Sequence, residues 1–245
     1  ESKDDPQRRD ESLLSVIPKD RRRMYEVREI IDSVVDRDSF FETMPEYGRP
    51  LVTGLARLDG YPVGVMANDT KHRGGAVDAP ASDKMMRFID LCDTFHIPVV
   101  YLVDNPGFLI GTEAEQEGTV RLGSRALAAC YQARVPWVSI IIRRCYGVAG
   151  AGHANSDGLN LRYAWPSADW GSLPIEGGGQ AAYRRDTQAA GAPVVEVVAG
   201  RAEQFQITSM AVLLPVDLFL RLLDAQPELK GLGQQGHAKF VQNTV

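Results

Sequence analysis

The sequence contains two copies of one unit, which consists of a helix-like stretch, a proline, a run of apolar residues and a glycine-rich turn. The first run, "IPVVYLVD", leads to "NPGFLIG", and the second, "VPWVSIIIR", leads to "CYGVAGAG"; their prolines, Pro98 and Pro136, are 38 residues apart. Neither run alternates polar and apolar residues, which is typical of strands covered on both faces of a parallel sheet. The spacing predicts βαβ units, and therefore an α/β fold with a mostly parallel sheet.

The flanking segments predict the other elements. Two strand-like runs meet at Asp59-Gly60, which predicts a β-hairpin. Helical spacing of apolar residues predicts amphipathic helices within residues 25–36, 78–98 and 119–134, and "LRYAWPSAD" predicts a third, shorter parallel strand. On the two longer helices we expect these side chains to face inward: Met85, Phe88, Ile89, Cys92 and Phe95, then Val120, Leu127 and Tyr131.

Composition excludes several classes of function. The 245 residues carry a net charge of −5, so there is no basic field to attract nucleic acid. No apolar run approaches the roughly 20 residues of a membrane helix, and the charged beginning has no signal-peptide core. The single cysteines Cys92, Cys130 and Cys145 lack zinc-ligand spacing, so we expect them to be buried thiols in a reducing compartment. The sequence predicts a cytoplasmic protein without a metal, nucleic-acid or membrane partner.

The two glycine-rich turns are the candidate sites of chemistry. Ligands of open α/β sheets bind beyond the carboxyl ends of the strands, where both turns lie. Glycine lets backbone N–H groups approach a ligand closely, and two such groups aimed at one point form an oxyanion hole. The alternative, that these glycines only allow strand and helix to pack closely, stays open on the residues alone.

Catalytic side chains are scarce near these turns. There is no G-x-S-x-G motif, dinucleotide fingerprint or phosphate loop. His153 is the histidine that we place near a site, and Glu176 is a candidate base at a pocket edge. We expect Glu113, Glu115 and Glu117 to form a solvated first helical turn. A site rich in backbone donors and poor in acid–base groups favours enolate chemistry, which mainly requires stabilisation of an oxyanion.

At these turns the sequence resembles the carboxyltransferase (beta) component of biotin-dependent acyl-CoA carboxylases, which belongs to the crotonase superfamily. The matching motifs occur in order, from "LLSVIPKDRRRMYEVREIIDSVVD" through "GLARLDGYPVGVMAND" and "SDKMMRFIDLCDTFHIPVVYLVDNPGFLIG" to "VPWVSIIIRRCYGVAGAG" and "YAWPSADWGSLPIEGGGQAAYRR". The resemblance covers roughly residues 13–186. It implies a crotonase-like ββα superhelix and, within it, the C-terminal half of the family's two-part subunit.

The resemblance implies transfer of a carboxyl group from carboxybiotin to the α-carbon of an acyl-CoA through an enolate held by backbone oxyanion holes. The implied cofactor is biotin on a carrier protein, with the acyl-CoA as substrate. The implied partners are the N-terminal carboxyltransferase half or another subunit, a biotin carboxylase or carrier subunit, and further copies in a dimer-based oligomer that could reach a hexamer. We expect a chain matching one half to be catalytically incomplete by itself.

The resemblance also carries site residues to this sequence. The family's oxyanion-hole motif falls on Gly147, Val148 and Ala149 after Tyr146, and the neighbouring turn begins at Pro106. Its second glycine is Val148 here, and valine tolerates positive φ poorly. An alanine at 151, where relatives often have an acidic residue, leaves the acyl group open. The residues implied to contact the cofactor are Gly107, Phe108, Leu109, Gly111, Gly150 and Ala151.

Three alternative functions remain open beside the carboxylation reaction. The same site could decarboxylate, a crotonase-type hydratase or isomerase could use Glu176 as base, or the chain could be a non-catalytic scaffold of a carboxylase complex.

We expect a linker or arm over residues 1–24, a carboxyltransferase domain over 25–189 and a C-terminal extension over 190–245. The charged beginning without Met suggests a piece of a longer polypeptide.

Overall fold

The computed structural model describes residues 4–5, 8–155 and 158–172. The candidate base Glu176, the glycine-rich segment around it and the predicted extension over 190–245 lie outside these residues. The described helices, with two 3-10 helices marked η, are η1 (Glu11–Leu14), α1 (Val27–Val34), η2 (Arg73–Gly75), α2 (Ala79–Thr94), α3 (Thr112–Glu117), α4 (Thr119–Gln132) and α5 (Gly147–Ala151). The strands are β1 (Phe41–Thr43), β2 (Leu51–Leu58), β3 (Tyr61–Asn68), β4 (Val99–Asn105), β5 (Trp137–Tyr146), β6 (Asn160–Ala164) and β7 (Asp169–Gly171).

A mixed, mostly parallel sheet forms the centre of the described part. Its seven strands run in the order β1-β2-β3-β4-β5-β6, and β7 pairs with the carboxyl end of β5. The pairs β1–β2 and β2–β3 are antiparallel, whereas β3–β4, β4–β5, β5–β6 and β5–β7 are parallel. The predicted α/β fold with βαβ units is therefore confirmed.

The predicted hairpin is formed by β2 and β3. Leu58 pairs with Tyr61, so the connection has two residues, and both have positive φ (49° at Asp59 and 82° at Gly60). Positive φ at both positions matches the twist of the flanking strands, and Asp-Gly tolerates it well. The oxygens of Asp36 accept hydrogen bonds from the N–H groups of both turn residues, at 2.8 Å each.

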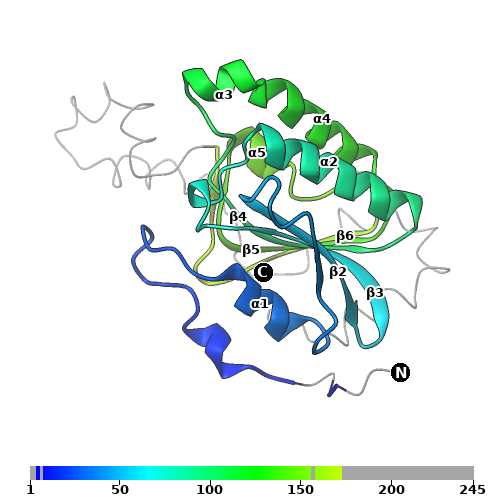
Figure 1. Ribbon diagram of the computed structural model, residues 1–245. Helices are drawn as coiled ribbons and strands as arrows, with labels where there is room; N and C mark the ends of the chain where they lie inside the picture. Colours follow the sequence, from blue (N-terminus) through cyan, green and yellow to red (C-terminus); the bar gives the residue numbers. More distant parts are fainter. Residues whose placement is uncertain (1–3, 6–7, 156–157, 173–245) are drawn as a thin grey trace, which may run out of the picture.

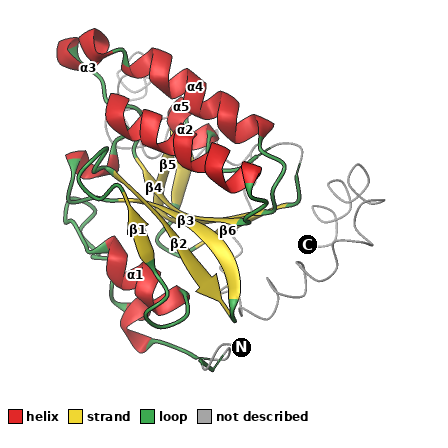
Figure 2. Cartoon of the chain, turned by 45° about the vertical axis from the view of Figure 1, so that its right-hand side comes forward, coloured by secondary structure: helices red, strands yellow, loops and turns green. Residues whose placement is uncertain are grey.

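Helices α2, α3, α4 and α5 lie on one face of the sheet, and α1 lies on the other (Figures 1 and 2). This arrangement follows from the topology, because β3, β4, β5 and β6 are added in one direction and right-handed crossovers then fall on the same face. Helix α2 begins at Ala79, where the side chain of Asp78 accepts a hydrogen bond from the N–H of Ala81, and Pro80 occupies its first turn.

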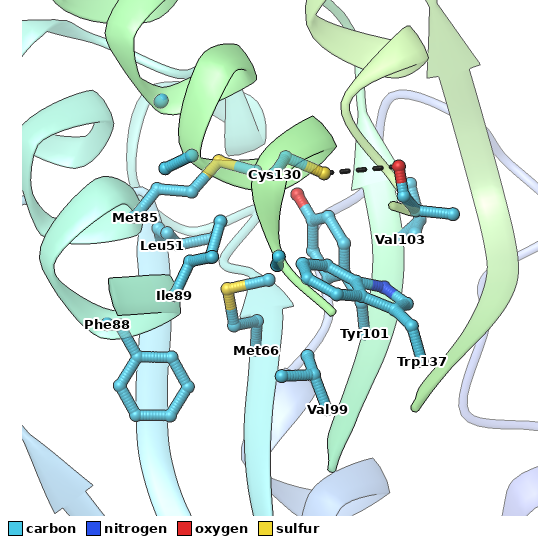
Figure 3. Close-up of a cluster of buried hydrophobic side chains, with 14 of the residues drawn as sticks. Leu51, Met66, Met85, Phe88, Ile89, Val99, Tyr101, Val103, Cys130 and Trp137 are labelled. Carbon is cyan, nitrogen blue, oxygen red and sulfur yellow. Dashed lines mark hydrogen bonds between the residues drawn. The ribbon is translucent and has the colours of Figure 1, made fainter. Parts of the chain in front are cut away.

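The larger hydrophobic core lies between the sheet and the α2–α4 layer. Figure 3 shows part of it, with side chains from α2, α4 and strands β2 to β5 pointing toward one another. Trp137 and Tyr101 are the largest fully buried residues there. Burial of this apolar surface fixes the two crossover helices against the sheet, and thereby the ends of β4 and β5.

A second core lies on the opposite face, beneath α1. Val27, Ile30 and Ile31 of α1 are fully buried and pack on alternate side chains of β2, β3, β4 and β5. Residues of the predicted arm, Leu13, Val16 and Ile17, pack against this core. The arm is therefore attached along the face of the sheet that α1 covers.

The inward faces of the two long helices differ from the prediction. Phe95 is 69% exposed, because α2 has already ended at Thr94. Val120 and Tyr131 are 60% and 41% exposed, so their predicted inward orientation was wrong. The buried residues of α4 are mostly small: Thr119, Gly123, Ala126, Ala129 and Cys130. Small side chains allow α4 to approach the elements beneath it closely, which a search for large apolar residues misses.

Among the helices of the described ranges, none is long and apolar enough to cross a membrane.

Candidate functional site

The sheet places the two glycine-rich turns side by side. Asn105, at the end of β4, is the parallel partner of Cys145 near the end of β5. The first turn, which we define as residues 106–111, follows Asn105 directly. The second, defined as residues 147–152, begins two residues after Cys145. Both turns therefore leave the carboxyl edge of the parallel sheet at adjacent positions, as predicted.

The first turn is attached by its backbone. The N–H of Val77 donates to the carbonyl of Gly107 at 3.0 Å, and the N–H of Leu109 donates to the carbonyl of Val77 at 2.9 Å. These two bonds form a parallel bridge between Val77 and Phe108. The ring of Phe108 packs over Gly123 of α4, where a Cβ would lie 2.6 Å from the ring. Backbone pairing and one aromatic ring thus fix this turn.

The outer side of the first turn is open. Gly107 and Gly111 have φ values of 131° and 121°, and a Cβ at either would meet no described atom within 4 Å. Ile110 is 86% exposed. Gly111 then precedes α3, whose glutamates Glu113 and Glu115 are exposed in the first turn, as predicted; Glu117 is also exposed, but it ends α3 and does not belong to the first turn.

The second turn forms the short helix α5. Its positive φ, 61°, falls on Gly147, whereas Val148 is not among the described residues with positive φ. Valine at this position, where the resemblance implies a glycine, therefore causes no positive-φ strain in the backbone. Val148 is 66% exposed and Ala149 is buried. Both lie in the first turn of α5, where N–H groups have no acceptor within the helix, and neither donates to the backbone of another described segment. Gly150 is buried and Ala151 is exposed.

Side chains beneath the second turn bind its carbonyl oxygens. The thiol of Cys145 donates to the carbonyl of Gly150 at 3.3 Å, and the thiol of Cys130 donates to those of Gly152 and Ala154 at 3.4 and 3.2 Å. From the outside, the hydroxyl of Tyr131 donates to the carbonyl of Ala151 at 3.2 Å. The turn is therefore held through its carbonyl oxygens, and its first N–H groups have no acceptor among the described residues.

His153 is buried directly behind this turn. Its Nδ1 lies 2.5 Å from the carbonyl of Gly150, which assigns the proton to Nδ1 and leaves the Nε2 atom without a hydrogen-bond partner. The ring meets Trp170 edge-on, with centroids 5.0 Å apart. Burial lowers the pKa of His153, so the imidazole is neutral near pH 7. The histidine predicted near the site is there, as a support of the turn.

The three cysteines are free and buried, as predicted. Burial raises the pKa of each thiol to about 12, so all three remain protonated. Protonation is what allows Cys130 and Cys145 to donate hydrogen bonds to the second turn. Within the described residues no group of His, Cys, Asp and Glu could hold a metal ion.

An ionic cluster at the strand ends was not predicted from the sequence. Asp104 of β4 is fully buried and contacts Arg143 and Arg144 of β5, at 2.9 and 2.6 Å from their Nε atoms. Its position near the end of a mostly apolar strand, two residues before the first turn, is the signal that could have indicated it. Partners from another strand cannot be inferred from one sequence.

Comparison with known proteins places the chain in one family. The model of the carboxyl transferase domain matches residues 1–222. The carboxyltransferase subunit of propionyl-CoA carboxylase from Haloferax mediterranei is 37% identical over 191 residues, covering 78% of this chain and 37% of that protein. The 12S subunit of methylmalonyl-CoA carboxyltransferase from Propionibacterium freudenreichii is 38% identical over 182 residues, covering 74% and 35%.

Solved structures share the fold. A crystal structure of transcarboxylase 12S, described as a hexamer assembly with methylmalonyl-CoA bound, superposes with a TM-score of 0.78 at 32% identity, covering 91% of this chain and 45% of that one. The beta subunit of geranyl-CoA carboxylase from P. aeruginosa gives 0.72 at 25% identity, covering 86% and 43%. The chain thus spans between a third and a half of the length of these relatives.

The predicted carboxyltransferase resemblance and crotonase-like α/β fold agree with these matches. Membership of one family explains the paired turns, the mostly parallel sheet and the long match to carboxyltransferase subunits. The chain belongs to the carboxyl transferase domain family of biotin-dependent acyl-CoA carboxylases.

Proposed function

We propose that the chain is the biotin-side, C-terminal half of an acyl-CoA carboxyltransferase. The observation that supports this most directly is the second turn, whose carbonyl oxygens are bound by buried side chains while the N–H groups of Val148 and Ala149 have no described acceptor. Two N–H groups at adjacent residues, neither bound by a described acceptor, are the donors that an oxyanion requires. The names of the matched relatives supply the reaction class.

The residues present suit a biotin group. The donors are backbone amides rather than ionisable side chains, and the space outside Gly107 and Gly111 is clear of described atoms. Biotin, when bound, supplies the carboxyl group and a ureido nitrogen that acts as the base. In our proposal Gly107, Phe108, Leu109, Gly111, Gly150 and Ala151 form the walls around it.

The contribution of this chain is electrostatic. The amides of Val148 and Ala149 stabilise the oxygen that becomes negative during the transfer, and Gly147 supplies the backbone conformation that presents them. Preorganised donors of this kind need no reorientation when charge develops. Neutral His153 keeps the carbonyl of Gly150 turned inward, so that no competing acceptor faces the oxyanion.

The complete enzyme requires partners. We propose that an N-terminal carboxyltransferase half completes the site, that a biotin carboxylase or carrier subunit delivers biotin, and that copies assemble into a dimer-based oligomer in the cytoplasm. The solved transcarboxylase 12S is described as a hexamer, which supports this assembly. The relatives include a methylmalonyl-CoA decarboxylase alpha subunit from Veillonella parvula, 39% identical over 184 residues, so the direction of transfer must be measured.

Removal of one amide proton tests the proposal. The parent protein, with both halves, is assayed in both directions: transfer of the carboxyl group from methylmalonyl-CoA to free biotin, and from carboxybiotin to acetyl- or propionyl-CoA. Val148→Pro removes the N–H, and proline is tolerated in a first helical turn. We expect kcat to fall by about 100- to 1,000-fold, the cost of one oxyanion-hole donor. Circular dichroism verifies that the variant is folded.

Val148→Ala is the matched control, because it removes the exposed side chain and keeps the N–H. We expect it to lose no more than about threefold in kcat. A folded Val148→Pro variant as active as Val148→Ala would contradict the assigned donors. A wild-type protein that carboxylates and decarboxylates none of the thioesters would contradict the enzyme assignment and favour the scaffold.

A further inference from the structure

The pairing of β4 with β5 is interrupted immediately before the two turns. Val103 pairs with Ile141 and Asn105 pairs with Cys145. One residue of β4, Asp104, therefore lies opposite three residues of β5, of which the last two are Arg143 and Arg144. An irregularity of this kind bends the strand and redirects its side chains, and such bulges occur often beside active sites.

Asp104 binds both arginines of this bulge. One carboxylate oxygen accepts from Nε of Arg143 at 2.9 Å and from the hydroxyl of Tyr25 at 2.9 Å. The other accepts from Nε and from the backbone N–H of Arg144, at 2.6 and 3.2 Å. The carboxylate is fully buried and the side chain of Arg143 is 3% exposed. Burial and the adjacent Asp104 raise the pKa of Tyr25, which stays a neutral donor.

The arginines extend this cluster to two other segments. Nη2 of Arg144 donates to the carbonyl of Gly74 in η2 at 2.6 Å. Nη1 of Arg143 donates to the carbonyls of Arg21 and Arg23 in the arm, at 3.2 and 2.9 Å. The cluster around Asp104 therefore joins the end of β4, the end of β5, η2 and the arm at one buried point.

We propose that Asp104 is a positioning residue for carboxyl transfer, which sets the second turn relative to the first by closing the bulge in β5. The first turn begins two residues after Asp104, and Gly147 lies three residues after Arg144. This inference rests on the proposed function, because it concerns the same site. Asp104 acts through the backbone of the two turns, so the name catalytic residue does not apply to it.

The electrostatics explain why the bulge depends on this carboxylate. Arg143 and Arg144 bring two positive charges, and Asp104 is the anion that both of them contact. Asp104→Asn keeps the size of the side chain and removes the charge. The buried guanidinium of Arg143 and the mostly buried one of Arg144 then both lose the carboxylate that they contact, which is strongly unfavourable. We expect them to separate, and the end of β5 to shift with them.

The test compares kinetics with backbone exchange in the parent protein. For Asp104→Asn we expect kcat for carboxyl transfer to fall by about 10- to 100-fold, the scale of a misplacement near 1 Å. KM for the acyl-CoA should change by less than about twofold, since uniform binding is retained. Hydrogen exchange of amides 145–152 should become at least about tenfold faster, while amides of α2 exchange as in the wild type.

Asp69→Asn is the matched control. Asp69 also follows a strand, its side chain is 1% exposed, and it accepts from Nη1 of Arg28 and the N–H of Lys71 at 2.8 and 2.9 Å. We expect this variant to lower stability and to leave kcat and exchange of residues 145–152 within about twofold of the wild type. Equal losses of kcat in both variants would overturn the proposal, because the effect would then be general destabilisation.

Arg144→Met covers the case in which Asp104→Asn does not fold. It leaves the buried Asp104–Arg143 pair and the backbone N–H bond of residue 144 to Asp104 intact, and removes the guanidinium contacts with Asp104 Oδ1 and the carbonyl of Gly74. We expect the same changes in exchange and kcat, each about tenfold. Wild-type exchange and wild-type kcat in this variant would overturn the proposal. An inactive wild type would contradict the proposed function alone, and the exchange of residues 145–152 would then decide on Asp104.

Discussion

The two turns at the carboxyl edge of the sheet are neighbours, but they are held in opposite ways. The first turn pairs through its own backbone with Val77, and Phe108 fastens it to α4. The second turn pairs with none of the described strands. It is held by side chains that donate to its carbonyl oxygens, from Cys130, Cys145 and His153.

The difference explains what each turn can offer a ligand. Backbone pairing uses the N–H of Leu109 and the carbonyl of Gly107, so the first turn serves best as a wall. The side chains that donate to the second turn occupy only its carbonyl oxygens. The N–H groups of Val148 and Ala149 are therefore left without an acceptor among the described residues. A loop that must present donors is stabilised most simply through its acceptors, since buried carbonyls also require partners.

The largest loss of stability and activity is expected from a substitution at Gly150, where the second turn contacts the backbone of β5. A Cβ on Gly150 would lie 2.8 Å from the carbonyl carbon of Cys145, an atom that cannot move without shifting β5. We expect Gly150→Ala to destabilise the protein by about 3 kcal/mol, the upper part of the range for overpacking. We also expect a loss of carboxyl transfer of about 100-fold. Urea denaturation and the thioester assay measure the two effects.

Gly152→Ala is a useful companion, because the Cβ there would meet the end of the Leu127 side chain at 2.4 Å, and that side chain can rotate. We expect about half the loss of stability seen for Gly150→Ala. If Gly150→Ala were as stable and active as the wild type, the close contact with β5 would not determine the geometry of the second turn.

A smaller effect is expected at the first turn, because its close contact is with a side chain. Gly123→Ala would place a Cβ 2.6 Å from the ring of Phe108. We expect a loss of about 1.5 kcal/mol. Adding Phe108→Leu, which removes the ring, should recover part of it, so that the two changes are not additive. Additive losses in urea denaturation would show that the ring does not fasten this turn to α4.

The central fold could be predicted because its pattern is local. The apolar runs after Pro98 and Pro136, the Asp59-Gly60 turn and the apolar spacing of α2 each lie within a short segment. The same holds for the two turns, which the glycines and the order of the strands place at one edge of the sheet. Local signals of this kind agree with the final structure because local preference and global packing favour the same conformation.

The support of the turns could not be predicted, because it depends on partners from distant segments. Cys130 precedes its acceptor at Gly152 by 22 residues, and Arg143 contacts Asp104 across 39 residues. The inward face of α4 was missed for another reason. Helix packing there uses Gly123, Ala126 and Ala129, whereas the large residues Val120 and Tyr131 are exposed. Hydrophobic size alone does not identify a face built for close approach.

The smallest expected effect is a pH dependence of stability that arises at the second turn and not at the first. No residue of the first turn titrates, whereas His153 lies behind the second, and burial lowers its pKa. Unfolded histidine has a pKa of about 6.5. At pH values between about 6.5 and the lower folded pKa, the histidine is protonated in the unfolded chain and neutral in the folded chain. The stabilisation from neutral His153 is therefore complete above about pH 6.5 and is lost as the pH falls below that value. The loss is about 1.4 kcal/mol for each unit by which the folded pKa is lowered.

His153→Phe removes this titration and keeps an aromatic ring against Trp170. We expect the variant to be less stable than the wild type at pH 8 by about 1 kcal/mol, because the hydrogen bond to the carbonyl of Gly150 is lost. Between pH 6.5 and 5 the difference should shrink, since only the wild type loses stability through protonation at this position. Urea denaturation of both proteins across this range measures it. A difference that stays constant with pH would mean that His153 binds a proton equally well in the folded and unfolded chain, and that the second turn tolerates a charge directly behind the N–H groups proposed as oxyanion donors.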